Sequence, residues 1–65
     1  PPYHHDHADR TLRILGERAT ELIAPAALVV AQVGRRDPLE DAYTPLHIVD
    51  RRHYAETTIA FYSLQ

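Results

Sequence analysis

Several residue types that carry recognisable chemistry are absent or scarce in this chain. The 65 residues include no cysteine, which excludes disulfides and a cysteine nucleophile and favours the cytoplasm. Only two glycines are present, Gly16 and Gly34, so there is no glycine-rich phosphate-binding loop. No apolar run reaches the roughly 18 residues needed to cross a bilayer, and the N-terminus lacks the apolar core of a signal peptide. We therefore expect no membrane partner.

Lysine is also absent, so all seven cationic side chains are arginines, against nine acids and a net charge of -2. This balance lacks the basic surface typical of a nucleic-acid-binding protein. A chain of this length has room for one domain, residues 1–65, which buries only about 60% of the surface that its unfolded state exposes. Without disulfides, the usual additional stabilisers are a metal or oligomerisation.

The longest apolar run lies between Pro25 and Gly34. Its length and its β-branched residues favour a strand, Ala26 to Val33. Both alternating faces of this strand are apolar, which is typical of a strand in the middle of a sheet. We therefore predict that it is the central strand.

An amphipathic helix is predicted from Asp6 to Ala24, after an extended arm at residues 1–5. Apolar residues recur at helical spacing, Pro25 ends the pattern, and Gly16 interrupts it where another backbone packs close. The apolar face comprises Ala8, Leu12, Leu15, Ala19 and Leu22.

The second half of the chain predicts a short helix followed by a hairpin. Asp37, Pro38 and Glu40 have the spacing of a helix N-terminus, which predicts helical turns from Pro38 to Tyr43. Strands are expected at 46–49 and 57–64, joined by the polar residues 50–53. The predicted fold class is α+β, with one long helix on a three-stranded sheet in the order α-β-short α-β-β. A second apolar sheet face is then left to be closed by oligomerisation or by a partner.

A histidine-rich segment offers candidate metal ligands. Imidazole and carboxylate groups suit Zn, Ni or Fe, and the candidate ligands are His4, His5, His7 and Asp9. Residues this close in sequence rarely complete a coordination shell, so a distant ligand, His47 or His53, is needed. The alternative is a solvated helix start, in which Asp6 and Asp9 interact favourably with the helix dipole.

Two arginine pairs lie at predicted strand ends: Arg35 with Arg36, and Arg51 with Arg52. If their loops meet, they form an anion clamp; the alternative is exposed loops neutralised locally by Asp37 and Asp50.

No convincing catalytic set emerges from the sequence. Its serine, Ser63, lies inside a predicted strand without a nucleophile-elbow pattern. His53, Tyr54 and Glu56 could transfer protons in a shared pocket, or simply form hairpin surface. Pro1 resembles the N-terminal proline base of tautomerases, but Pro2 follows it where that superfamily has an apolar strand.

The helix opening Asp6-His7-Ala8-Asp9, followed by strands, resembles a small C-terminal domain attached to haem-utilisation split-barrel proteins. The resemblance covers four residues. The expected glycine-containing strand turn is replaced by Arg51-Arg52-His53, and no site residues are carried over.

The leading functional hypothesis is a non-catalytic interaction or assembly domain, or an accessory subunit, that forms a homo-oligomer or docks on a larger protein, without a cofactor. The rivals are an oligomeric enzyme or metal-dependent sensor that uses the histidine segment, and anion or ligand binding at the arginine pairs.

Overall fold

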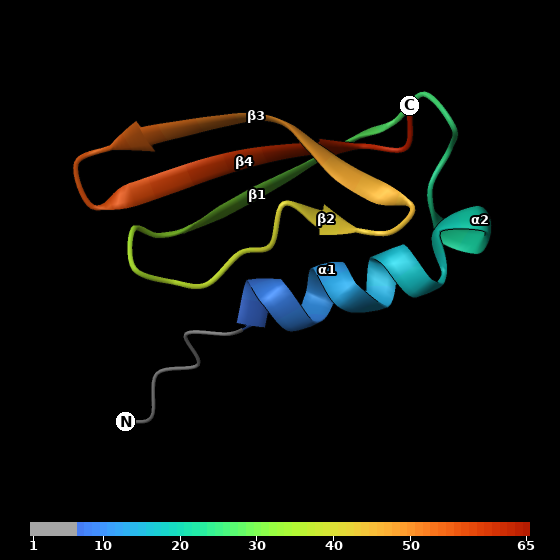
Figure 1. Ribbon diagram of the computed structural model, residues 1–65, viewed down its shortest axis with the longest axis horizontal. Coiled ribbons are helices and arrows are strands. Elements are labelled where there is room, and N and C mark those ends of the chain that lie inside the picture. Colours follow the sequence, from blue (N-terminus) through green and yellow to red (C-terminus); the bar gives the residue numbers. More distant parts are fainter. Residues whose placement is uncertain (1–6) are drawn as a thin grey trace.

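The chain folds into an α+β structure with an N-terminal helix and a curled four-stranded antiparallel sheet (Figure 1). The computed structural model describes residues 7–65. The elements are α1 (His7–Glu17), α2 (Ala19–Leu22), β1 (Leu28–Gly34), β2 (Ala42–Tyr43), β3 (Leu46–Tyr54) and β4 (Thr57–Ser63).

The order of strands in the sheet is β1-β4-β3-β2. β3 and β4 form a hairpin that closes after the pair Tyr54 and Thr57, with Ala55 at a positive φ of 50° in the turn. β1 pairs with the other side of β4, from Leu28 opposite Ser63 to Gly34 opposite Thr57. The last strand in the sequence therefore lies inside the sheet, between two earlier ones.

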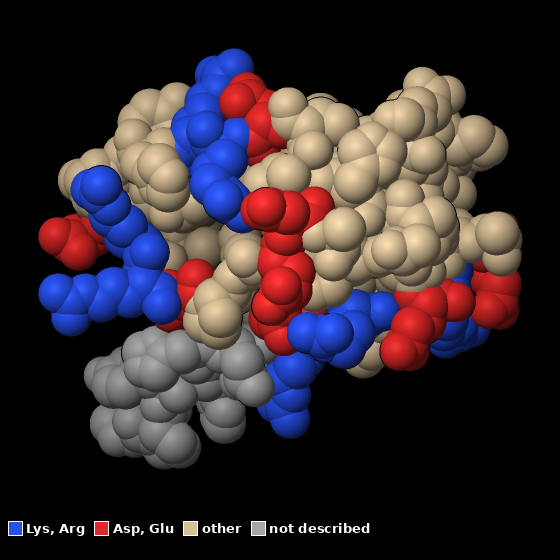
Figure 2. All heavy atoms as spheres, viewed as in Figure 1, with Lys and Arg blue, Asp and Glu red and all other residues tan. Residues whose placement is uncertain are grey.

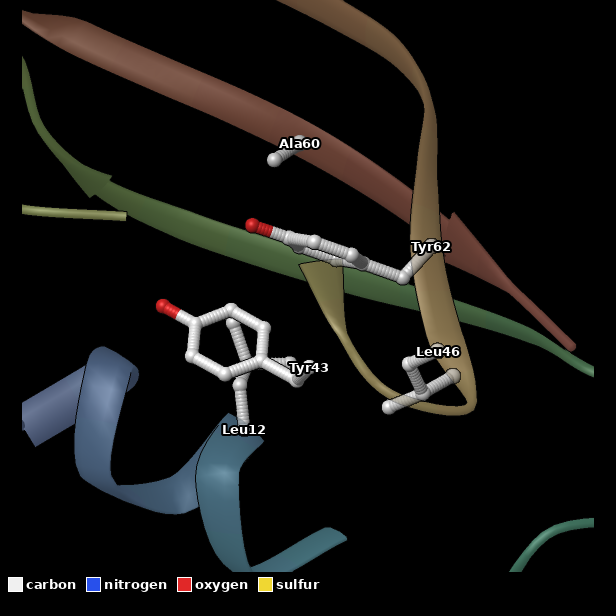
Figure 3. Packing of buried hydrophobic residues seen from close by; sticks show 5 residues of the cluster. All are labelled: Leu12, Tyr43, Leu46, Ala60 and Tyr62. Atoms are coloured by element: carbon white, nitrogen blue, oxygen red, sulfur yellow. The ribbon is translucent and has the colours of Figure 1, made fainter. Parts of the chain in front are cut away.

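The core lies where α1 and β2 meet the concave face of the sheet. Tyr62 and Ala60 on β4 are fully buried, and Leu12 approaches them from α1 (Figure 3). Tyr43 on β2 contacts Tyr62 edge to face, with ring centroids 5.6 Å apart. Because side chains alternate along a strand, the burial of Thr58, Ala60 and Tyr62 on β4 makes the intervening positions the outer face.

The predicted long helix is divided in two, so the prediction of one helix from Asp6 to Ala24 is wrong after Glu17; Asp6 and the predicted arm at residues 1–5 lie outside the described residues. α1 ends at Glu17, and Arg18 has a non-helical ψ of 27° before α2 begins. Leu12 and Ala19 are buried as predicted, but Leu22 is 50% exposed. The break follows Gly16, a poor helix former, and α2 leaves the line of α1 (Figure 1).

Gly16 is required for the packing of α1 against β2. A Cβ atom built at Gly16 would lie 2.2 Å from the carbonyl oxygen of Tyr43, far inside van der Waals contact. The prediction that a second backbone packs closely at this glycine is confirmed.

The predicted central strand is an edge strand. β1 has β4 on one side and no strand on the other among residues 7–65. Its two faces differ: Val29, Ala31 and Val33 are at least partly buried, whereas Leu28 and Val30 are each 54% exposed. The inner positions belong to β4, which pairs with β1 and β3, and to β3, which pairs with β4 and β2.

The predicted helical turns from Pro38 to Tyr43 are absent, and this segment contains the strand β2 instead. The groups that would cap a helix have other partners. The Asp37 carboxylate accepts a hydrogen bond from the Gly34 N–H at 3.0 Å, and the Glu40 N–H donates to the Tyr43 hydroxyl at 2.8 Å.

The predicted polar connection at residues 50–53 is part of β3, which runs from Leu46 to Tyr54. Residues 50–54 are all exposed, so this end of the strand is held by its pairing with β4 rather than by burial. The sheet therefore has four strands, one more than predicted.

Candidate interaction surface

An open groove runs between α1 and the edge strand β1. It has a volume of about 790 Å³, within the range of about 300–1,000 Å³ that is common for ligand sites. Ala8, Thr11, Leu12 and Leu15 line it from α1, and the consecutive residues 29–34 line it from β1. Because neighbouring residues of a strand point to opposite faces, a lining by six consecutive residues means that the groove follows the backbone edge of β1.

Among residues 7–65, the backbone edge of β1 that faces this groove has little of the usual protection of an edge strand. Edge strands are commonly blocked by charged residues, by proline or by a covering segment. The β1 sequence, Leu28–Gly34, contains none of these residues, and His7 and Asp37 are the charged or titratable side chains that line the groove. The groove thus presents a neutral, largely apolar strand edge.

The outer face of the sheet continues this apolar surface. Val30 lies opposite Phe61 and Gln32 lies opposite Ile59, so these side chains share the outer face with the exposed Leu28. Part of the face is covered by Arg52, whose guanidinium carbon lies 5.6 Å from the centre of the Phe61 ring. In Figure 2, uncharged atoms form a broad area in the upper right of the view, while charged side chains lie at the left, in a band from the top through the middle, and along the lower right border.

A polar network fixes α1 to the opposite edge of the sheet. The Tyr43 hydroxyl donates to the Asp9 carboxylate, which also accepts from Arg13 at 3.0 Å. Arg13 lies over the Tyr43 ring, 5.6 Å from its centre. The Tyr62 hydroxyl donates to the Glu40 carbonyl at 2.7 Å, so the two tyrosines hold the backbone of Glu40.

This network shifts the pKa values of its members. The hydrogen bond from Tyr43, followed by the one from Arg13, lowers the pKa of the Asp9 carboxyl below its usual value. Burial, reinforced by donation to Asp9, raises the pKa of the Tyr43 hydroxyl well above its usual value. Tyr43 therefore stays protonated and Asp9 stays ionised at neutral pH, which suits a structural contact.

The candidate metal ligands are only partly described by the structure. His4 and His5 lie outside the described residues. His7 and Asp9 both lie on α1, and Asp9 is engaged by Tyr43 and Arg13. Within residues 7–65, no group of three or more histidine, aspartate or glutamate side chains is placed to hold a metal ion.

The arginine pairs are split by the structure. Arg35 and Arg51, one from each pair, line the same hollow of about 170 Å³ with His53 and Thr58, whereas Arg36 and Arg52 are not part of its lining. The strand alternation that puts Arg51 on the inner side puts Arg52 on the outer side, over Phe61.

Both arginines of the hollow already have partners. Arg35 Nη1 donates to the Ala55 carbonyl and Arg51 Nη2 to Asp41, each at 3.0 Å, and Asp37 also lines the hollow. Its positive charge is therefore largely compensated.

The proposed proton-transfer group is not gathered in one pocket. His53 Nδ1 lies 2.9 Å from the Thr58 hydroxyl and lines the hollow, whereas Tyr54 and Glu56 do not line it. Tyr54 is the next residue of the same strand and points to the other face.

Comparison with known proteins adds no relative. No family model matches the chain, and no curated protein or solved structure is significantly similar to it. In the part of the chain that the structure describes, no helix has the length and apolar character to cross a membrane.

Proposed function

We propose that this chain is a non-catalytic interaction domain that assembles by adding a strand to the edge of β1, and that the added strand is β1 of a second copy. The observation that carries the proposal is the open edge of β1 along the groove beside α1. An extended segment placed there gains backbone hydrogen bonds from β1 and apolar contacts from α1, as in other cases of strand addition.

The composition of β1 favours a second copy as the occupant. A strand that fills the groove needs apolar side chains toward α1 and toward the outer face, and β1 has both, with Val29 and Ala31 on one side and Leu28 and Val30 on the other. Because Leu28–Gly34 carries no charge, two antiparallel copies place no like charges opposite each other. A two-fold axis also joins the two exposed outer faces into one surface.

The direct test is the molar mass of the native chain and two variants at micromolar concentration, by sedimentation equilibrium. The native chain should have the mass of a dimer. Val30→Lys should reduce the association by at least about tenfold, since it places a charge at the edge from both copies. Val49→Lys is the matched control, because Val49 is exposed to a similar degree on β3 and lies away from β1.

Two single proline variants, at Val30 and at Ala31, test whether the copies meet through the backbone edge of β1 or through the outer face of the sheet. Because Arg35 donates its N–H to the Glu56 carbonyl, alternation along the antiparallel ladder turns the Ala31 N–H toward β4 and the Val30 N–H toward the open edge. Val30→Pro should therefore stay folded and become monomeric, whereas Ala31→Pro should unfold the chain. A native chain that sediments as a monomer, or a dimer insensitive to both changes at Val30, would contradict the proposal. A monomer that binds an uncharged extended peptide would replace the second copy by a different partner.

A second candidate function has one observation in its favour. We propose, as the alternative, that the hollow between Arg35 and Arg51 binds a small oxyanion, because the guanidinium groups of Arg35, which follows β1, and Arg51, on β3, line it together with Thr58. Titration with inorganic phosphate, monitored by the NMR signals of His53 and Thr58, tests it. An Arg35→Gln variant that responds to phosphate like the native chain would rule it out.

A further inference from the structure

Asp37 occupies both backbone hydrogen-bonding groups of Gly34, the last residue of β1. The Gly34 N–H donates to Asp37 Oδ2 and the Asp37 N–H donates to the Gly34 carbonyl, each at 3.0 Å. A Cβ at Gly34 would lie 3.2 Å from the same carboxylate oxygen, so the contact is close. Gly34 is therefore closed to any added strand.

The ladder with β4 shows which other residues face the open edge. Arg35 donates its N–H to the Glu56 carbonyl at 2.7 Å, in the register that continues from Gly34 opposite Thr57. In an antiparallel ladder, residues bonded to the neighbouring strand alternate with residues whose backbone groups point away from it. The backbone N–H and C=O groups that bond to β4 are therefore those of Val29, Ala31 and Val33. The backbone groups that point to the open edge are those of Leu28, Val30, Gln32 and Gly34.

We infer that two copies of the chain pair antiparallel with Val30 on the two-fold axis, in a register set by Asp37. This inference rests on the self-association proposed above. In this register Val30 is bonded to Val30 of the second copy, and Leu28 is bonded to Gln32 of the second copy. Every edge-facing residue that Asp37 leaves open then gains a bonded partner.

The neighbouring register is disfavoured by the same contact. With Ala31 on the axis, Leu28 of each copy lies opposite Gly34 of the other. That pair requires the Gly34 N–H and carbonyl, which are bonded to Asp37. Forming it would break the turn after β1, and Gly34 would only exchange its bonds to Asp37 for bonds to the second copy.

The inferred register also matches side-chain size on the concave face. Val29 lies opposite Ala31 of the second copy in a non-bonded pair, where Cα atoms approach to about 4.5 Å. A small residue opposite a β-branched one suits this short separation.

Disulfide trapping tests the register, and the absence of native cysteine makes each trap specific. In the inferred register, a Val29→Cys chain mixed with an Ala31→Cys chain should form the mixed disulfide, because a separation of about 4.5 Å suits a disulfide. Ala31→Cys alone should cross-link at least several-fold less, since two such residues are then about 7–8 Å apart. One chain carries a mass tag so that mass spectrometry distinguishes the products.

Asp37 variants test whether this residue sets the register. Asp37→Ala frees Gly34 and should raise the self-cross-linking of an Ala31→Cys chain several-fold. Asp37→Asn keeps an oxygen acceptor and should retain the native pattern, and Asp50→Ala, on β3, is the control for a lost carboxylate.

The outcomes separate the two proposals. If the chain is dimeric through β1 but Ala31→Cys alone cross-links as well as the mixture does, the register is wrong and the assembly stands. If Asp37→Ala leaves the pattern unchanged, Asp37 does not set the register. If the chain is monomeric, or its association does not depend on Val30, the assembly itself is refuted.

Discussion

The two edges of the sheet differ in how far their backbone is covered by the rest of the described chain. At one edge, β2 is two residues long, α1 packs against its backbone at Gly16, and Tyr43 is held by Asp9 and Glu40. At the other edge, β1 is seven residues long and uncharged, and within residues 7–65 a side chain, that of Asp37, closes the backbone of Gly34. Edge protection is a general requirement for avoiding unwanted pairing. Within residues 7–65, the fold meets this requirement at the β2 edge and leaves most of the β1 edge uncovered, and this difference is the basis of the proposed assembly.

The largest effect is expected from breaking the protected edge with Gly16→Ala. Alanine is the better helix former by about 1 kcal/mol. The added methyl group would nevertheless collide with the Tyr43 carbonyl, so a net loss of about 2 kcal/mol in unfolding free energy is expected. Urea denaturation measures it, with the exposed neighbour Glu17→Ala as the control. A stabilised Gly16→Ala variant would show that α1 and β2 are not in close contact.

A smaller effect is expected when the polar attachment of the same edge is removed by Tyr43→Phe. The variant loses the hydroxyl that donates to Asp9 and accepts from Glu40. Loss of a hydrogen bond to a charged group typically costs about 1.5–3 kcal/mol, and the surroundings relax in part, so the unfolding free energy should fall by roughly 1–2 kcal/mol. Tyr54→Phe, at an exposed position, should cost less than about 0.5 kcal/mol. Equal losses of unfolding free energy for the two variants would mean that the Tyr43 hydroxyl does not stabilise the attachment of α1 to β2.

The pH dependence of stability should change in the same variant. Because the pKa of Asp9 is lowered by folding, its contribution is present above the unfolded value of about 3.9 and is lost as the pH falls through the folded value. The pKa of Tyr43 is raised by folding, so its pH dependence runs the other way. Its contribution to stability is present below about pH 10 and is lost as the pH rises above that value. Tyr43→Phe should therefore flatten the stability profile in acid and in strong base, as measured by thermal unfolding across pH. A profile parallel to that of the native chain would contradict both shifts.

The hairpin turn between the two edges offers a change in the opposite direction. Ala55 has a φ of 50°, which costs a residue with a Cβ about 1 kcal/mol relative to glycine. Ala55→Gly should raise the unfolding free energy by up to about 1 kcal/mol, with Ala42→Gly in β2 as a destabilising control. Destabilisation by both would place Ala55 in an ordinary conformation.

The smallest effect on folding is expected at the open edge. In the monomeric state, reached by dilution, Val30→Lys should change the unfolding free energy by no more than about 0.5 kcal/mol, because its side chain is 54% exposed and its backbone N–H points away from β4. Chemical denaturation at that dilution checks this. A loss above about 1 kcal/mol would mean that Val30 supports the fold itself, and association data for its variants would need to be reinterpreted.

Most helices and strands could be predicted from local sequence patterns, but the pairing of the strands within the sheet could not. Helical spacing gave the buried Leu12 and Ala19, and alternation gave β4 almost to the residue. The position of β1 within the sheet depends on which strand returns to it, and that strand, β4, begins 23 residues after β1 ends. Its two apolar faces were read as two buried faces, when one of them is half exposed.

The wrongly predicted helix after Asp37 shows that contacts with residues distant in sequence can override a local helix-start pattern. The spacing of Asp37 and Glu40 is that of a helix start, but Tyr43 takes the Glu40 N–H while its own hydroxyl is fixed by Asp9, 34 residues earlier. Of the four arginines predicted to form an anion clamp, Arg35 and Arg51 line one hollow, and strand alternation turns Arg52 away from it; anion binding itself stays a prediction. The open edge itself has one sequence signal, a strand without charge or proline, and the same signal is typical of a central strand.

The position of β4 has a consequence during synthesis of the chain. Of the four strands β1 is made first and β4 last, so β1 leaves the ribosome before its only neighbour in the described sheet does. Until then the strand has two free edges rather than one, and both carry the same neutral apolar sequence. Such a nascent segment is prone to pair with other chains, and contacts this distant in sequence form slowly. Newly made chains should therefore be most vulnerable to aggregation after β1 has emerged and before β4 has paired with it.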